Sequence, residues 1–130
     1  MKASEILKNL VALNEVSQKS LPIKLSYAIS VNIGKLQAAA KHIEEQRMKL
    51  LERYADQDAD GKPVIKNNHY QIGDGNMPEL TKEMDSLMEE DTEIEIRKVP
   101  LECLDLCDNP RCDMLSAKDI LALDFMIANE

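Results

Sequence analysis

The chain is poor in aromatic residues and in the side chains on which many enzymatic reactions depend. Its 130 residues include one Phe, three Tyr, no Trp, two His and three Cys. The hydrophobic core must therefore consist of Leu, Ile, Val, Met and Ala, and an aliphatic core with seven Met suits packed helices better than a β-sandwich. No apolar run approaches the roughly 20 residues of a membrane-spanning helix, so we expect no membrane partner.

Recognisable catalytic motifs are also missing. Neither His42 nor His69 lies in a Ser-His-Asp or Cys-His arrangement that can be identified in the sequence. The chain has no phosphate-binding glycine loop and no His-Glu-x-x-His motif. The residues from Met1 to Glu5 lead into an amphipathic stretch rather than into the apolar core of a signal peptide. We therefore predict a protein that is not an enzyme, has no catalytic residues or cofactor, and is not secreted by that route.

The three cysteines, Cys103, Cys107 and Cys112, are an odd number in a chain without an expected signal peptide. This favours free thiols in a reducing compartment. Their spacings of four and five do not match the paired Cys-x-x-Cys of a zinc finger, and a histidine or a nearby aspartate would have to supply the fourth ligand. We favour small, half-buried side chains in a helical segment over a zinc site, and predict no metal ligands.

The charge is distributed unevenly along the chain. Residues 1–55 carry 9 Lys and Arg against 5 acids, a net charge of +4, whereas residues 56–130 carry 7 against 19, a net charge of −12. One interpretation is that the acidic half folds back over the basic half; another is that the basic face of one copy meets the acidic face of the next. The total of −8 disfavours DNA or RNA as a direct partner, because phosphate binding needs a surplus of Lys and Arg.

A long helix from Pro22 to about Tyr54 dominates the basic half. Its apolar seam, interrupted once, has the alternating four- and three-residue steps of a coiled coil, and comprises Ile29, Ile33, Leu36, Ala40, Ile43, Arg47, Leu50 and Tyr54. All of these except Ala40 and Arg47 are candidate interaction residues. The spacing predicts that Leu36 and Ile43 are buried, either within the fold or in an oligomer interface. At 1.5 Å per residue the helix would span about 50 Å, so part of it should project or pair.

The remaining pattern indicates short elements around this helix. Before the long helix we expect a first helix, from a Ser4 cap to about Gln18. A hairpin of 63–66 and 69–72 follows the long helix, and a further helix covers 78–90. The chain should then form a half-exposed strand over 91–99, a helical turn over 101–106, and a last helix capped by Ser116 and Asp119. Together they predict one α+β domain over residues 1–130, mostly α: a long helix or helical hairpin with a small β element. Residues 1–55 form its helical basic part and residues 56–130 its acidic α/β part.

Two acidic features are candidate sites. Asp56, Asp58, Asp60 and Gly61 match positions 1, 3, 5 and 6 of an EF-hand loop, but Asn67 stands where the loop needs a bidentate Glu. We therefore favour a simple helix-to-hairpin turn over a calcium site. The second feature, called the acidic run below, is a candidate interaction surface and comprises Glu89, Glu90, Asp91, Glu93 and Glu95. A solvated acidic edge explains it better than a pair of catalytic carboxylates.

Several segments resemble small proteins encoded by tailed phages and prophages. The resemblance lies in Leu21–Tyr27, Leu50–Ala55, Asp58–Val64 and the short helix and Glu-Ile-Glu-Ile strand within Leu87–Ile96. It covers roughly residues 20 to 100, leaves out the three cysteines, and carries over no active-site residues. The resemblance implies a phage context, in the host cytoplasm or in the virion.

Two functions fit this context. The leading hypothesis is a structural or assembly component that acts by protein–protein binding and forms a homo-oligomer through its long helix. The alternative is a host-takeover or anti-defence inhibitor whose acidic half occupies a basic surface of a host protein. A metal-dependent binding module that uses the aspartate turn is a more distant third.

The acidic turn provides the first testable prediction. We expect calcium affinity to be millimolar or weaker, because the closing carboxylate is missing at Asn67. Gly61→Val should impair folding if Gly61 supplies a positive φ, whereas Asp58→Asn should be nearly neutral. Calorimetric titration with calcium measures the affinity. A micromolar isotherm that disappears in Asp58→Asn would instead establish a metal site.

Overall fold

The structure, a computed structural model, describes residues 1–104 and 112–128. In chain order its elements are α1 (Ala3–Val16), α2 (Ile23–Tyr54), β1 (Ile65–Lys66), β2 (His69–Tyr70), α3 (Met77–Glu89), β3 (Val99–Pro100), the 3-10 helix η1 (Leu101–Leu104), α4 (Ala117–Leu123), the 3-10 helix η2 (Asp124–Met126) and β4 (Ile127–Ala128). This confirms the predicted α+β class, mostly α, with a long helix and small β elements.

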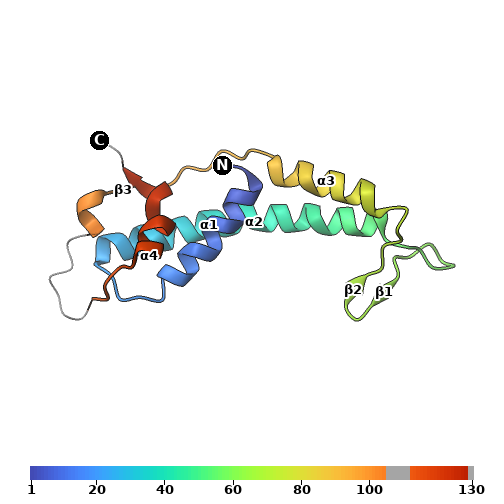
Figure 1. The fold of residues 1–130 in the computed structure, drawn as a ribbon, viewed down its shortest axis with the longest axis horizontal. Coiled ribbons are helices and arrows are strands. Elements are labelled where there is room, and N and C mark those ends of the chain that lie inside the picture. The colour runs from blue at the N-terminus through green and yellow to red at the C-terminus, as the bar shows by residue number, and fades with distance from the viewer. Residues whose placement is uncertain (105–111, 129–130) are drawn as a thin grey trace.

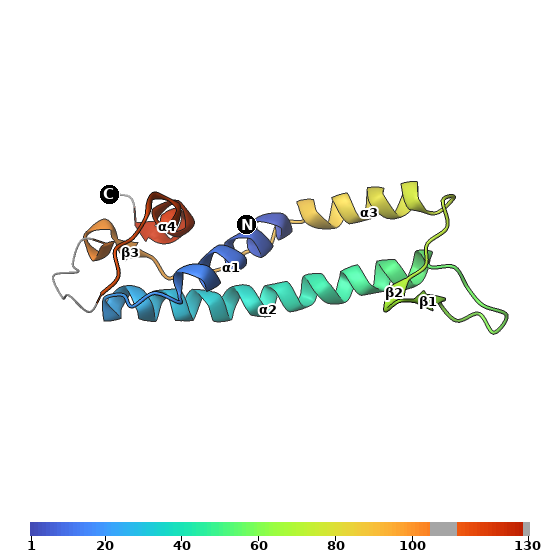
Figure 2. The ribbon, with the colours of Figure 1, turned by 60° about the horizontal axis from the view of Figure 1, so that its bottom comes forward.

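Helix α2 is the axis of the molecule. Its 32 residues span about 48 Å at 1.5 Å per residue. Figures 1 and 2 show α1 and α4 over the N-terminal half of α2, and α3 running antiparallel beside its C-terminal half. We call the first part the body and the second part the two-helix arm. The length of the helix predicted that part of it would project, and the arm is that part. The β1–β2 hairpin lies at the far end of the arm (Figure 2).

The predicted seam is buried by the chain itself. Leu36 is fully buried and Ile43 is 7% exposed, as the spacing predicts, and Ile29 is also buried. These three residues belong to a core cluster that also includes buried residues of α1, η1 and α4. The other candidate seam residues, Ile33, Leu50 and Tyr54, are half-buried. Their participation in an interface between copies remains a prediction.

The first helix begins earlier than expected. Ser4 does not cap it; the helix starts at Ala3, with Lys2 as the N-cap residue, and ends at Val16 rather than near Gln18. The N-terminal segment is already held before the helix, because the Ala3 N–H donates to the Glu90 carbonyl at 2.9 Å. This contact with the end of α3 holds the start of the first helix in place, which was the role predicted for the Ser4 cap.

The predicted strand over residues 91–99 is wrong for most of its length. Only Val99–Pro100 forms a ladder, pairing in parallel with β4, while residues 92–98 belong to no strand. The alternation itself is present, since Ile94 and Ile96 are half-buried against the core and Glu93 is exposed. A period of two reports which side chains face inward, but it does not require a neighbouring strand.

Side chains of α2 hold this segment in place of a partner strand. The Asn32 side chain accepts a hydrogen bond from the Arg97 N–H at 2.8 Å and donates one to the Arg97 carbonyl at 3.0 Å. The Lys35 ammonium donates to the Glu95 carbonyl. A helix thus satisfies backbone groups that a sheet would otherwise pair.

The hairpin and the last helix lie where the sequence predicts them, although the hairpin strands are only two residues long, at 65–66 and 69–70 instead of 63–66 and 69–72. In the hairpin Ile65 pairs with Tyr70 and Lys66 with His69, and the two turn residues Asn67 and Asn68 have φ of 53° and 65°. Helix α4 has the expected cap, in which the Ser116 hydroxyl oxygen accepts from the Asp119 N–H at 3.2 Å. The predicted helical turn is present over Leu101–Leu104, and residues 105 and 106 lie outside the described part.

Two helices of the acidic half, α3 and α4, fold back over the basic half (Figure 2), in agreement with the first of the two interpretations of the uneven charge. Ion pairs join Lys2 to Glu89 at 2.8 Å and Arg53 to Glu83 at 3.4 Å, and both link the basic half to α3. These pairs are exposed, so each contributes little stability.

Truncation of a seam residue should be costly. We expect Leu36→Ala to lower the free energy of unfolding by about 2–5 kcal/mol, because it leaves a cavity at a fully buried site. Chemical denaturation monitored by circular dichroism measures the change. Ile65→Ala is the matched control, since Ile65 is 60% exposed on the distant hairpin and should lose far less. Equal effects of the two substitutions would contradict the assignment of Leu36 to the core.

Candidate interaction surfaces

The residues first considered for metal binding or catalysis lie apart. His42 has an 81% exposed side chain on α2, and His69 is exposed on the hairpin. Cys103 is buried and Cys112 half-buried, while Cys107 lies outside the described residues. Within residues 1–104 and 112–128, no three His, Cys, Asp or Glu side chains are grouped so that they could hold a metal ion.

The acidic turn is organised by its own backbone. The Asp58 Oδ1 accepts hydrogen bonds from the Asp60 N–H at 2.9 Å and from the Lys62 N–H at 3.0 Å, and the Asp56 Oδ1 accepts from the Gly73 N–H at 3.2 Å. Gly61 has φ +77°, which confirms the positive φ predicted for it. An Asn side chain could replace the acceptor oxygen of Asp58, which explains why Asp58→Asn should be nearly neutral. The calcium affinity of the turn remains a prediction.

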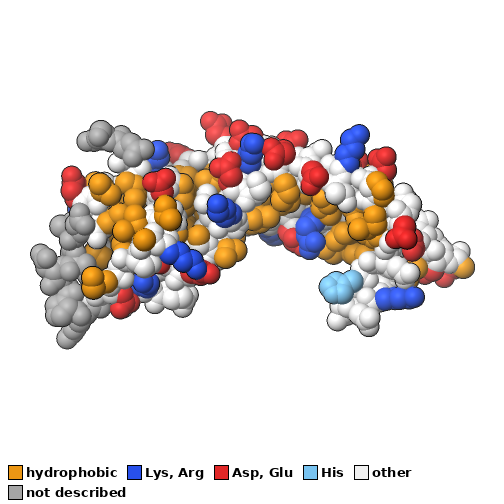
Figure 3. Space-filling model, viewed as in Figure 1, with side chains coloured by type: hydrophobic (Ala, Val, Ile, Leu, Met, Phe, Trp, Pro, Cys, Tyr) orange, Lys and Arg blue, Asp and Glu red, His pale blue; other side chains and the backbone are white. Residues whose placement is uncertain are grey.

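The acidic run leaves α3 and continues along the extended segment toward β3. Glu89 pairs with Lys2 at 2.8 Å. Asp91 pairs with the N-terminal ammonium at 2.7 Å, and the hydrogen bond from that ammonium lowers the pKa of the Asp91 carboxyl. The other three acids, Glu90, Glu93 and Glu95, are exposed and form no ion pair with any residue that the structure describes. Figure 3 shows acidic side chains along this upper edge of the molecule.

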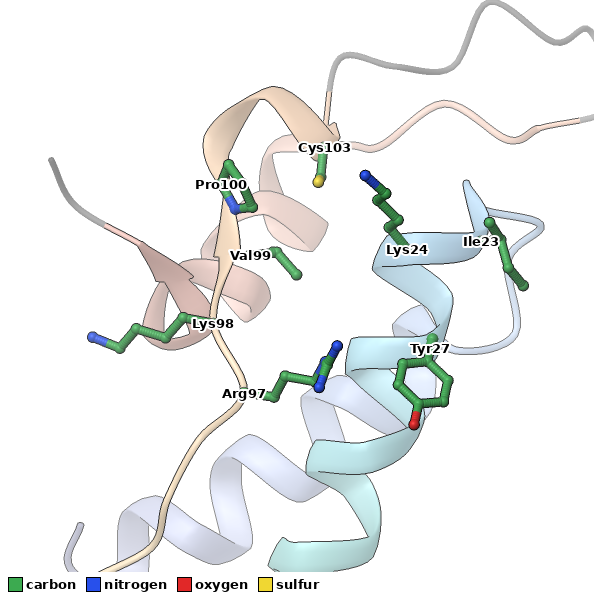
Figure 4. A pocket seen from close by; sticks show the side chains of 8 residues that line it. All are labelled: Ile23, Lys24, Tyr27, Arg97, Lys98, Val99, Pro100 and Cys103. Carbon is green, nitrogen blue, oxygen red and sulfur yellow. The ribbon is translucent and has the colours of Figure 1, made fainter.

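A cavity that the sequence did not reveal lies between the start of α2 and the segment around β3 (Figure 4). We call it the Tyr27 pocket; its volume is about 460 Å³, and it is lined by Ile23, Lys24, Tyr27, Arg97, Lys98, Val99, Pro100 and Cys103. Its lining is mixed, with apolar side chains beside three cations. Figure 4 shows that the Arg97 guanidinium lies beside Tyr27 and that the Lys98 ammonium points away. The cavity thus presents Lys24 and Arg97 to any occupant.

The Arg97 guanidinium is stacked on an aromatic ring. Its central carbon lies 5.0 Å from the centroid of the Tyr27 ring, within the range of a cation–π interaction. Within the described residues, no ion pair is formed by Arg97, by Lys24 or by Lys98. Sequence reasoning missed this pocket because its two walls are about 70 residues apart. The only local signal was the pair Ile23 and Tyr27, which share a helix face outside the seam.

Exposed apolar side chains gather at the same end of the molecule. We call this set the apolar end; it comprises Ile23, Tyr27, Leu101, Met114, Ile120 and Leu121, which are 43–89% exposed. Leu101, Met114 and Ile120 line one hollow, and Ile23 and Tyr27 line the adjoining Tyr27 pocket. Figure 3 shows hydrophobic side chains over this end of the body, and others along the arm. A patch of this kind is typical of a protein–protein contact.

One nearly buried carboxylate links α4, which carries Ile120 and Leu121, to the segment that follows α1. Asp119, 9% exposed, lies 2.6 Å from the Lys19 ammonium and accepts hydrogen bonds from the Ser116 N–H and hydroxyl, both at 2.9 Å. The hydrogen bond from Lys19, and next those from Ser116, lower the pKa of the Asp119 carboxyl to about 2. Lys19 follows α1, so this cluster joins α4, and with it Ile120 and Leu121, to the end of α1.

Comparisons with protein-family models, with curated proteins and with solved structures found no match to this chain. The interpretation of these surfaces therefore depends on the chemistry of their own residues. In the described part of the chain, no helix has both the length and the apolar character needed to cross a bilayer.

The Asp119 cluster should make stability depend on pH. The folded-state pKa of about 2 lies below the ordinary 3.8, so the ionised carboxylate stabilises the fold above about pH 4, and this contribution is lost as the pH falls toward 2. We expect Asp119→Asn to be less stable than the natural chain near neutral pH, with the difference shrinking between about pH 4 and pH 2. Denaturant titrations across this range measure it. Asp85→Asn, at an exposed carboxylate of α3, is the control, and a difference independent of pH would contradict the assignment.

Proposed function

We propose that this chain is a non-enzymatic phage protein that acts by protein–protein binding, as a structural or assembly component that forms oligomers. The observation that supports the binding role is the apolar end. The phage context comes from the resemblance of residues 21–27, 50–55 and 58–64 to small phage proteins.

The exposed side chains of the apolar end are large. Ile23 is 80% exposed, Leu121 76% and Met114 89%, and they share one end of the molecule with Tyr27 and Leu101. Scattered exposed apolar residues are ordinary, but a gathered group in an otherwise strongly charged chain favours a contact surface. Covering this surface with another protein would remove it from water.

The long helix can take part in such an interface, but not through the centre of its seam. Leu36 and Ile43 are already covered by the chain's own helices. Ile23 and Tyr27, in the first turns of α2, are exposed and lie outside the seam. We therefore propose that oligomers form around the start of the long helix and the neighbouring α4.

The acidic run favours a second candidate function. Glu90, Glu93 and Glu95 have no ion-pair partner among the described residues, and the whole chain has a net charge of −8. Such a surface would fit a basic surface of a host protein, including one that normally binds nucleic acid. An inhibitor of this kind would need no oligomer.

Sedimentation velocity tests the proposal directly. We expect the natural chain to form a defined multimer at micromolar concentration, and a double variant, Ile23→Asp with Leu121→Asp, to be a monomer because charges replace the apolar contacts. Ile65→Asp is the matched control, since Ile65 is 60% exposed but lies on the distant hairpin. It should leave the multimer intact.

The two functions predict different results in the same measurement. A natural chain that stays monomeric at every concentration and salt condition would contradict the assembly role and favour the inhibitor. A multimer that survives the double variant would show that the apolar end is not the interface. Circular dichroism must show that each variant is folded before its sedimentation is interpreted.

A further inference from the structure

The Tyr27 pocket contains cations without partners in a protein that has an excess of acids. Lys24 and Arg97 both border the cavity (Figure 4), and the described residues supply neither with an ion pair. The stacking on Tyr27 restricts where the Arg97 guanidinium can lie, so less freedom is lost when it binds an anion. An anionic group is therefore the ligand that this pocket suits.

The surroundings of the pocket favour a few carboxylates over a polyanion. The chain has a net charge of −8, and the acids Glu95 and Glu102 stand within five residues of Arg97 in the sequence. A nucleic acid would be repelled by this field, because its binding requires many cations along its backbone. A short acidic segment of a protein can place one or two carboxylates between Lys24 and Arg97. Apolar neighbours, Ile23 and Val99, would contact the rest of such a segment.

The chain itself displays a segment of this chemistry next to the pocket. Along the extended connection from α3 to β3, Glu93, Glu95 and Arg97 alternate with the half-buried Ile94 and Ile96, and all three are exposed. Alternate residues of an extended chain face the same side, so two negative charges are followed by a positive charge on one outward face. Turning a second strip by 180° about Ile96 places its Glu95 opposite the single base, Arg97, of the first, and its Arg97 opposite the first Glu95.

We propose that the Tyr27 pocket receives Glu93 and Glu95 of a second copy of this chain, which aligns antiparallel to the first along residues 93–99. With a two-fold axis at Ile96, Glu95 of each copy lies opposite Arg97 of the other, and Glu93 lies opposite Val99, which lines the pocket beside Lys24. The contact is self-complementary and closes after two copies, as two-fold interfaces do.

This inference depends on the proposed oligomerisation and identifies the contact that sets the relative orientation of the two copies. Exposed ion pairs are individually weak and are screened by salt. We therefore expect the charges to fix how the two copies align, while burial of Ile23 and Tyr27, which lie beside the pocket, contributes most of the stability of the contact. Association should therefore weaken as salt rises beyond about 0.15 M. Association through the apolar end alone would not show this dependence.

Two charge-reversal variants and their mixture test the inference. The first variant combines Glu93→Lys with Glu95→Lys, and the second combines Lys24→Glu with Arg97→Glu. Each should weaken self-association by about tenfold or more, because like charges then face each other. Mixed in equal amounts, the two should form a heterodimer, since one strip is then wholly basic and the other wholly acidic.

Matched controls carry the same charge change elsewhere. Asp74→Lys with Asp85→Lys matches the first variant, and Lys66→Glu with Lys82→Glu matches the second; all four positions are exposed. Sedimentation equilibrium of the full chain at about 0.05 M and about 0.5 M salt should show control dimers as strong as those of the natural chain. Circular dichroism verifies that every variant is folded.

The outcomes separate this inference from the proposed function. A natural chain that multimerises but does not respond to the reversals or to their mixture overturns the antiparallel contact and leaves assembly through the apolar end standing. A monomeric natural chain overturns the second copy as occupant. If that monomer binds the blocked peptide Glu-Ile-Glu-Ile in a manner lost in Lys24→Glu with Arg97→Glu, the occupant is the acidic segment of another protein.

Discussion

The structure depends most on one buried amide, the side chain of Asn32. It is fully buried in the middle of an aliphatic core, and it both accepts from the N–H and donates to the carbonyl of Arg97, 65 residues away in the sequence. A buried amide left without partners would cost about 1–3 kcal/mol, so the two chain segments are held in this one register. By holding Arg97, Asn32 positions the segment that leads into β3 and forms one wall of the Tyr27 pocket.

The features that could be predicted from sequence are those encoded by neighbouring residues. The long α2, the Asn67-Asn68 turn and the Ser116 cap each depend on residues only a few positions apart, and each is found where it was expected. The burial of Leu36 followed from helical periodicity, although the spacing could not tell whether the chain or another copy would cover it.

What could not be predicted depends on contacts distant in sequence. An alternating pattern over residues 91–99 is compatible with a strand. In the structure, however, Asn32 and Lys35 of α2 hydrogen-bond to the backbone of this segment in place of a neighbouring strand. The Tyr27 pocket requires that residues 23–27 and 97–103 come together, which neither segment shows by itself. The first helix starts at Ala3 for a related reason, since its backbone is held by Glu90.

The continuity of α2 has a mechanical consequence. One helix of 32 residues joins the body to the hairpin, so it can act as a lever. A tilt of about 10° where the body meets another protein would displace the far end of a helix about 48 Å long by about 8 Å. The exposed Ile65 and His69 on the hairpin would therefore move between different neighbours, although no side chain within the body had changed its contacts.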